Sequence, residues 1–151
     1  MSKAFVKEDS HGIEDTLPDR RIPPHANLVT REGLAQIDAT IARLELDLAT
    51  AQANSAPTAA IARDLRYWNA RRLTAQLVQL PNNGRVQFGS RVTMEREGGV
   101  RQTYRIVGID EADPSRGTLS YVSPLAQALL EKEAGDNIAV ASASVKIVEI
   151  A

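Results

Sequence analysis

The side chains that could do chemistry lie in one acidic segment and at two histidines. Asp110, Glu111 and Asp113 could bind a cation, because hard divalent ions prefer carboxylate oxygens, but a polar loop is the favoured interpretation. His11 and His25 lie in a proline-rich arm without helical spacing, so they do not predict a metal site. Cysteine is absent, which excludes disulfides, thiolate catalysis and cysteine-ligated zinc. We find no glycine-rich phosphate loop and no nucleophile–base set, and predict no catalytic residue, metal or cofactor.

A group of arginines has two interpretations. They could follow nucleic acid or a protein channel, or they could form a solvated face that pairs with nearby acids. The formal net charge is −1 and aromatic residues are few, so the solvated face is favoured. The arginines are Arg63, Arg66, Arg71 and Arg72, and the acids are Asp38, Glu45 and Asp47.

Two helical stripes precede Pro81. Thr30 is the predicted N-cap of the first helix, with Glu32 in its first turn. Its apolar residues follow heptad spacing and require a partner helix: Leu34, Ile37, Ile41, Leu44 and Leu48. The second helix supplies that partner in an antiparallel hairpin, with a broader apolar face: Ile61, Leu65, Trp68, Leu73, Leu77 and Leu80. We expect Trp68 to pack across the hairpin or against the N-terminal arm.

The turn between the helices is predicted at 54–56, in a run of small residues. Pro57 suits the first turn of the second helix and no deeper position. The hairpin tip therefore consists of Asn54, Ser55, Ala56 and Pro57. No Asp or Glu occurs between Leu48 and Arg63, so the tip carries no carboxylate.

Residues 1–27 form a charged, proline-containing arm without sustained periodicity. A disordered or loosely draped tail is favoured. The alternative is a segment that orders on a partner or along the hairpin, with Phe5 and Val6 as anchors. The start of the chain lacks the apolar segment of a signal peptide. No apolar run is long enough to span a membrane, and we expect a cytoplasmic protein in a reducing compartment.

The chain becomes β-rich after Pro81. Predicted strands cover 86–88, 91–95, 102–109, 118–122, 138–141 and 145–150, and Gly98-Gly99 is a hairpin turn. A helix is predicted from Pro124 to Glu133, with Ser123 as N-cap and Gly135 as its stop. The fold class is α+β, and the predicted domains are an arm (1–27), a helical hairpin (28–80) and a small sheet domain (81–151).

Several of these segments resemble the bacterial Gre transcript cleavage factors. The linker and first strand match at 81–89, the central strand and loop at 103–113, and the signature helix at 123–136. The start of the first helix, 29–34, is also similar. The resemblance covers about Leu28 to Ile150, and it is specific because three C-terminal motifs occur in the right order.

The resemblance implies a coiled-coil finger that enters the secondary channel of RNA polymerase, and an FKBP-like domain that docks on the channel rim. It places docking at the start of the signature helix, on Tyr121, Val122, Ser123, Pro124 and Leu125. A capped helix start packed in the core is the alternative interpretation of Ser123–Leu125. In cleaving members, acids at the fingertip help to hold a catalytic Mg²⁺, and this tip has none.

The leading hypothesis is a monomeric Gre-type factor that binds RNA polymerase and modulates elongation without strong cleavage of its own. It is not an enzyme in itself and contacts no membrane. One alternative is an active cleavage factor that uses Asp47 or Asp64. Another is an FKBP-like prolyl isomerase, for which only Phe88, Tyr104 and Tyr121 could line a pocket.

Overall fold

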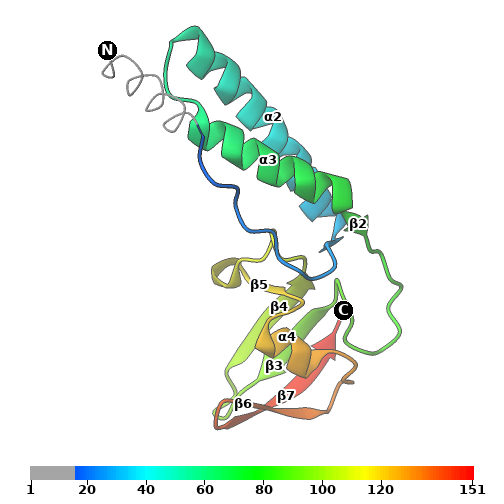
Figure 1. Ribbon diagram of the computed structural model, residues 1–151. Coiled ribbons are helices and arrows are strands. Elements are labelled where there is room, and N and C mark those ends of the chain that lie inside the picture. The colour runs from blue at the N-terminus through cyan, green and yellow to red at the C-terminus, as the bar shows by residue number, and fades with distance from the viewer. Residues whose placement is uncertain (1–15) are drawn as a thin grey trace, which may run out of the picture. The chain divides into compact units, whose positions relative to one another are not determined.

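The computed structural model describes residues 16–151, which form two compact units. The described residues of one unit are 16–24 and 35–74, and those of the other are 25–34 and 75–151. Helices and a sheet make the chain a mixed α+β protein (Figure 1). Phe5, Val6 and His11 lie outside the described residues. Within the described part of the chain, no helix has the length and apolar character needed to cross a membrane.

Two helices lie side by side and account for most of the first unit (Figure 1). They are α2 (Arg31–Ala53) and α3 (Ala59–Thr74). The predicted N-cap of α2 is confirmed, because the Gly33 amide donates to Thr30 Oγ1 at 3.0 Å. Ile37 and Leu44 of α2 are buried. Arg72 Nε lies 2.6 Å from a carboxylate oxygen of Asp38 and joins the two helices.

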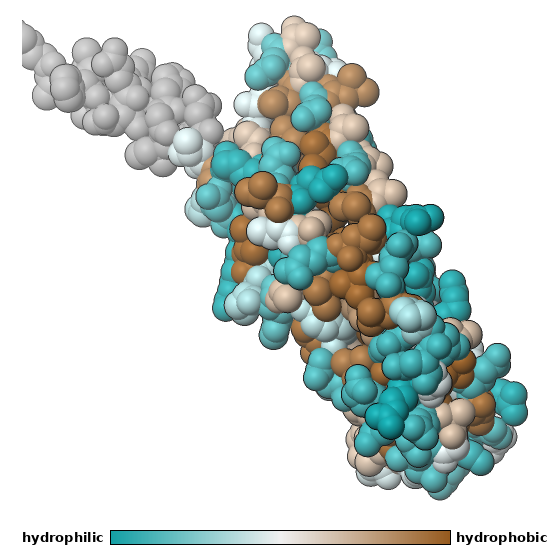
Figure 2. Space-filling view, turned by 90° about the vertical axis from the view of Figure 1, so that its right-hand side faces the viewer, coloured by the Kyte–Doolittle hydropathy of each residue, from teal (hydrophilic) through white to brown (hydrophobic). Residues whose placement is uncertain are grey.

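The predicted length of the second helix is wrong, because α3 ends at Thr74 and Leu73 is 87% exposed. The chain instead becomes extended as β2 (Gln76–Leu77) and pairs in parallel with β1 (Leu28–Val29). The amides of Gln76 and Val78 donate to carbonyls of the β1 segment at 2.8 and 3.0 Å. This pairing takes backbone groups that a longer helix would use internally. Figure 2 shows hydrophobic residues at the surface beside hydrophilic ones.

Residues 16–24 adopt no helix or strand, but their charged side chains contact α3. Asp19 lies 2.6 Å from Arg66 Nε, and Arg20 lies 3.4 Å from Asp64. The Arg20 guanidinium also lies 3.9 Å from the centre of the Tyr67 ring. This part of the arm is therefore ordered along the helix, as the alternative interpretation expected.

The arginines of α3 do not form one solvated face. Arg72 pairs with Asp38 as predicted, and Arg66 pairs with the arm. Arg71 is only 1% exposed, which contradicts the solvated-face prediction at that position. It lies one helical turn after Tyr67, which is also buried, so both occupy the inward side of α3.

The second unit is built on a five-stranded sheet with the order β5-β4-β3-β7-β6. Its strands are β3 (Arg91–Glu95), β4 (Arg101–Val107), β5 (Thr118–Ser120), β6 (Asn137–Val140) and β7 (Ala143–Ile150). β4 and β5 pair in parallel, and the other pairs are antiparallel. The short helix α4 (Pro124–Leu129) contributes Ala126 and Leu129 to the core. Core residues from the strands include Val92, Met94, Ile106, Leu119, Ile138, Val145 and Ile147.

Two predicted elements of this unit differ from the structure for one reason. α4 ends at Leu129 rather than near Glu133, and the predicted strand at 86–88 does not form. The amide of Glu131 donates to Val86 O, and the Val86 amide donates to Lys132 O, each at 2.8 Å. This reciprocal pairing requires an extended backbone directly after α4, so the helix cannot continue through these residues. Gly135 accordingly lies in a turn with φ of 95°, not at the helix end.

Candidate functional site

The segment Tyr121–Leu125 connects β5 to α4 and is held by local hydrogen bonds. Ser123 caps α4 as predicted, because its Oγ accepts the Ala126 amide at 3.3 Å. Pro124 occupies the first turn, where its missing amide hydrogen costs nothing. Pro124 is exposed and the other four residues are half-buried. The segment thus presents a short, largely apolar surface of well-defined backbone conformation.

Tyr121 ties this segment to the rest of its unit. Its hydroxyl donates to the carbonyl of Ala26, and its ring meets Phe88 edge to face with centroids 5.8 Å apart. Gln127 Nε2 donates to the Tyr121 carbonyl at 2.7 Å. The side chain of Tyr121 is therefore engaged within the protein. Tyr104, the third aromatic residue named for an isomerase pocket, packs against the hydrophobic core instead.

The turn between α2 and α3 is short and uncharged. All residues from Asn54 to Pro57 are exposed, and the Ala56 amide donates to Ala51 O at 2.8 Å. Ser55 adopts φ of 51°, the left-handed conformation that closes the turn. Pro57 was predicted in the first turn of the second helix, but α3 begins two residues later, at Ala59. The backbone closes this turn without any acidic side chain.

The carboxylates nearest the turn in sequence are Asp47 and Asp64. Asp64 lies 3.4 Å from the guanidinium groups of both Arg20 and Arg63, so its charge is already paired. Asp47 is an exposed residue of α2. In residues 16–151, no three His, Asp or Glu side chains come together in a way that could hold a metal ion.

The acidic segment at 110–113 is occupied by hydrogen bonds within the protein. Glu111 accepts from the backbone amides of Thr30 at 3.0 Å and Gly108 at 3.3 Å, and from the Thr30 hydroxyl. Asp113 caps the single turn of 3₁₀-helix Pro114–Arg116 by accepting the Ser115 amide at 3.1 Å. The hydrogen bond from the Ser115 hydroxyl is the main cause that lowers the pKa of Asp113.

Glu111 is an important residue that its sequence context did not reveal. Its carboxylate lies so close to Gly33 that a Cβ there would overlap it, and a Cβ on Gly108 would overlap the carbonyl oxygen of Leu28. The two glycines therefore permit close approach of β1, the start of α2 and the end of β4. We call Thr30, Gly33, Gly108 and Glu111 the Glu111 anchor. In the sequence, the signal for this close packing was two glycines that lie outside turns, Gly33 and Gly108.

Comparison with known proteins finds relatives for the C-terminal half of the chain. A family model described as "Transcription elongation factor, GreA/GreB, C-term" matches residues 81–151. The chain is 40% identical over 79 residues to transcription elongation factor GreA of Desulfovibrio desulfuricans, covering 50% of this chain and 49% of that protein. It is 40% identical over 86 residues to GreB of Pasteurella multocida, covering 56% and 54%. The chain spans about half the length of these curated relatives.

Two solved structures are also similar. The crystal structure of GreA factor homolog 1 (Gfh1) of Thermus thermophilus aligns with a TM-score of 0.42 and 17% identity, covering 84% of this chain and 99% of that one. GreA/GreB from Nitrosomonas europaea aligns with a TM-score of 0.42 and 23% identity, covering 82% and 98%. The similarity of residues 81–151 to the GreA/GreB factors rests on the sequence matches.

Residues 81–151 thus form a domain similar to the C-terminal domain of the GreA/GreB factors. The curated proteins to which this part of the chain is similar are the transcription elongation factors GreA and GreB.

Proposed function

We propose that this chain binds RNA polymerase at the rim of the secondary channel and modulates elongation without strong transcript cleavage of its own. The GreA/GreB C-terminal domain supports the partner. The acid-free turn Asn54–Pro57 is the observation that carries the second half of the proposal. A catalytic Mg²⁺ needs oxygen ligands, normally carboxylates, and this turn supplies none. Such a factor would act as a cytoplasmic monomer and would need no cofactor.

In this proposal the two units have separate roles. α2 and α3 act as an antiparallel coiled-coil finger, supported by buried Ile37 and Leu44 and by the Asp38–Arg72 ion pair. The sheet unit acts as an FKBP-like docking domain. Docking uses Val122–Leu125, where the capped start of α4 offers exposed Pro124 on a backbone of defined conformation. Tyr121 supports that segment from within its own unit.

The cleavage half of the proposal is tested on stalled elongation complexes. We expect RNA release with the added protein to be indistinguishable from that with polymerase alone, because the turn brings no carboxylate to a metal ion. We also expect it to slow cleavage by an added GreA that does cleave, because both would occupy one channel. Efficient cleavage by this protein alone would overturn the acid-free-turn argument.

The alternative cleavage mechanism is separated by substituting the two candidate acids. If cleavage did occur and the double variant Asp47→Ala/Asp64→Ala abolished it, those carboxylates would be the acidic groups that cleavage requires. The ion pairs of Asp64 with Arg20 and Arg63 disfavour that role. Glu45→Ala on α2 is the matched control, since it is also an exposed acid of the helical unit.

The docking half is tested by co-purification with core polymerase. We expect Ser123→Gly/Pro124→Ala to reduce binding by about tenfold, a loss of roughly 1.4 kcal/mol. Glycine remains a tolerated N-cap, so α4 should persist. Pro114→Ala is the matched control, because Pro114 is also exposed and begins a capped short helix in the same unit. Unchanged binding of the double variant would remove docking from this segment.

A further inference from the structure

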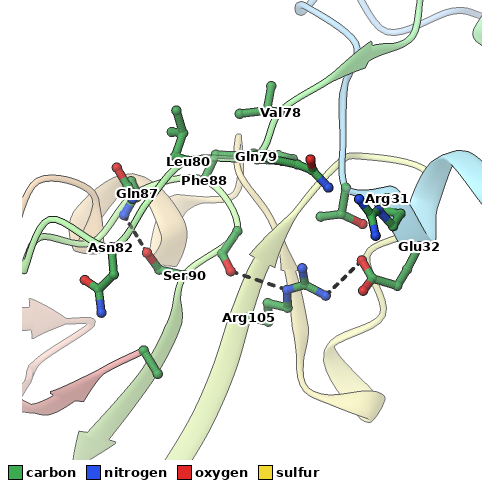
Figure 3. Close-up of a pocket in the computed structure, with 13 residues that line it drawn as sticks. Arg31, Glu32, Val78, Gln79, Leu80, Asn82, Gln87, Phe88, Ser90 and Arg105 are labelled. Atoms are coloured by element: carbon green, nitrogen blue, oxygen red, sulfur yellow. Dashed lines mark hydrogen bonds and ion pairs between the residues drawn. The ribbon is translucent and has the colours of Figure 1, made fainter.

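The sheet unit contains a cleft outside the proposed docking segment. Its volume is about 390 Å³, within the range of roughly 300–1,000 Å³ that is usual for ligand pockets. Its walls are the start of α2, the segment after β2 and the turn at 87–90 (Figure 3). None of the residues 121–125 lines it. We call it the Arg31 cleft, after the side chain that distinguishes it.

Two arginines line the Arg31 cleft, and only one of them forms an ion pair within the described residues. The Arg105 guanidinium donates to Glu32 and to the carbonyl of Gly89, each at 3.3 Å, and Figure 3 shows Arg105 pointing toward Glu32. A backbone hydrogen bond and the nearby Arg105 lower the pKa of Glu32, so this pair remains ionised and neutral overall. Arg31 also lines the cleft, and it forms no ion pair with any residue between 16 and 151. Among the side chains that line the cleft, positive charges therefore exceed negative charges by one.

One wall of the cleft is the irregular segment that follows β2, and it has backbone amides that are available for hydrogen bonding. The Val78 amide makes the last bond of the β1–β2 pairing, to Val29 O at 3.0 Å. Across the described chain, the amides of the next two residues, Gln79 and Leu80, donate to no backbone carbonyl. Both residues are exposed. A second extended chain could pair with these amides, as in recognition by strand addition.

Apolar side chains complete the site. Leu80 is 53% exposed, and it lines the cleft together with Phe88 (Figure 3). Phe88 is largely covered, so the cleft offers no open aromatic face for stacking a nucleic acid base. The lining suits a segment with alternating apolar and acidic side chains.

We propose that the Arg31 cleft binds an extended segment of a partner protein that carries a carboxylate next to an apolar side chain. The segment pairs with the backbone of Gln79 and Leu80, its apolar side chain covers Leu80, and its carboxylate pairs with Arg31. This binding surface is independent of the proposed docking at Val122–Leu125. Each surface can fail its test without affecting the other.

The test is a titration of the full ¹⁵N-labelled chain, followed by the amide resonances of Gln79 and Leu80. The probe is a short peptide of alternating leucine and glutamate with blocked ends. Two matched probes are the same peptide with lysine in place of glutamate and a short thymidine oligonucleotide. We expect the glutamate peptide alone to shift these resonances. No shift at millimolar peptide, or an equal shift with either matched probe, would overturn the proposal.

A pair of variants tests the role of Arg31. Arg31→Gln should weaken binding of the glutamate peptide by about two- to fivefold, as expected for a single exposed ion pair. Arg43→Gln is the control, because it removes an exposed arginine of α2 that does not line the cleft. Equal affinities of the two variants for the peptide would contradict the assignment of the carboxylate to Arg31.

Discussion

Gly108→Ala is expected to destabilise the sheet unit by about 3 kcal/mol, the upper end of the usual cost of overpacking. Gly108 is buried at the end of β4, and an added Cβ would overlap the carbonyl oxygen of Leu28 in β1. That oxygen belongs to the backbone, so it cannot rotate away as a side chain would. The two segments must separate, and the β1–β2 pairing that begins at Leu28 should weaken with them.

Urea denaturation can measure this effect separately in each unit. Amide resonances of β4 and β7 report on the sheet unit, whereas fluorescence of Trp68, the only tryptophan, reports on the helical unit. We expect the β4 and β7 resonances to report the loss of stability. Val100→Ala is the control, since Val100 is 58% exposed in the β3–β4 turn and should change stability by less than about 0.5 kcal/mol. A Gly108→Ala protein as stable as the control variant would contradict the proposed close packing.

Glu111→Ala is expected to destabilise the same unit by about 2–4 kcal/mol. The variant would leave the amides of Thr30 and Gly108 and the Thr30 hydroxyl without their acceptor. Thr30 is only 2% exposed, and a buried donor without a partner costs roughly 1–3 kcal/mol. Glu97→Ala, at an exposed position of the β3–β4 turn, removes a carboxylate without such partners. Equal stability of the two variants would mean that the Glu111 anchor contributes little.

A double-mutant cycle makes the test of the Glu111 anchor specific. Gly33→Ala alone should destabilise the protein, because the new Cβ would overlap the Glu111 carboxylate. In the Glu111→Ala background the same change should become neutral or stabilise by up to about 1 kcal/mol, since alanine favours helix over glycine. The Gly108→Ala cost should persist there, because Leu28 O is unchanged. Additive effects of Gly33→Ala and Glu111→Ala would contradict this arrangement.

Local signals in the chain predicted several elements well. Thr30 and Ser123 were identified as N-caps because a cap depends on a side chain and amides two or three residues away. β3 has the predicted bounds 91–95, where alternating residues face the core and solvent. The motifs between 81 and 136 predicted a resemblance to the Gre-type factors, and the match of the GreA/GreB C-terminal model to 81–151 confirms that resemblance.

Elements that depend on distant partners were predicted poorly. Leu73, Leu77 and Leu80 continue a helical apolar pattern, but α3 ends before β2 pairs with β1, far away in the sequence. The end of α4 was misplaced because the following residues pair with Val86. In both cases a backbone hydrogen bond to a remote segment replaced one that local propensity favoured.

The amino-acid sequence alone was enough for the resemblance of residues 81–151 to the Gre-type factors, the main helices and strands, and the lack of acids at the α2–α3 turn. These properties depend on residue types and on neighbours within a few positions. The Glu111 anchor, the burial of Arg71 and the Arg31 cleft emerged only from the folded chain. Each brings together side chains and backbone groups from segments far apart in sequence. Their proximity is decided by packing and pairing across the whole unit, which no local pattern encodes.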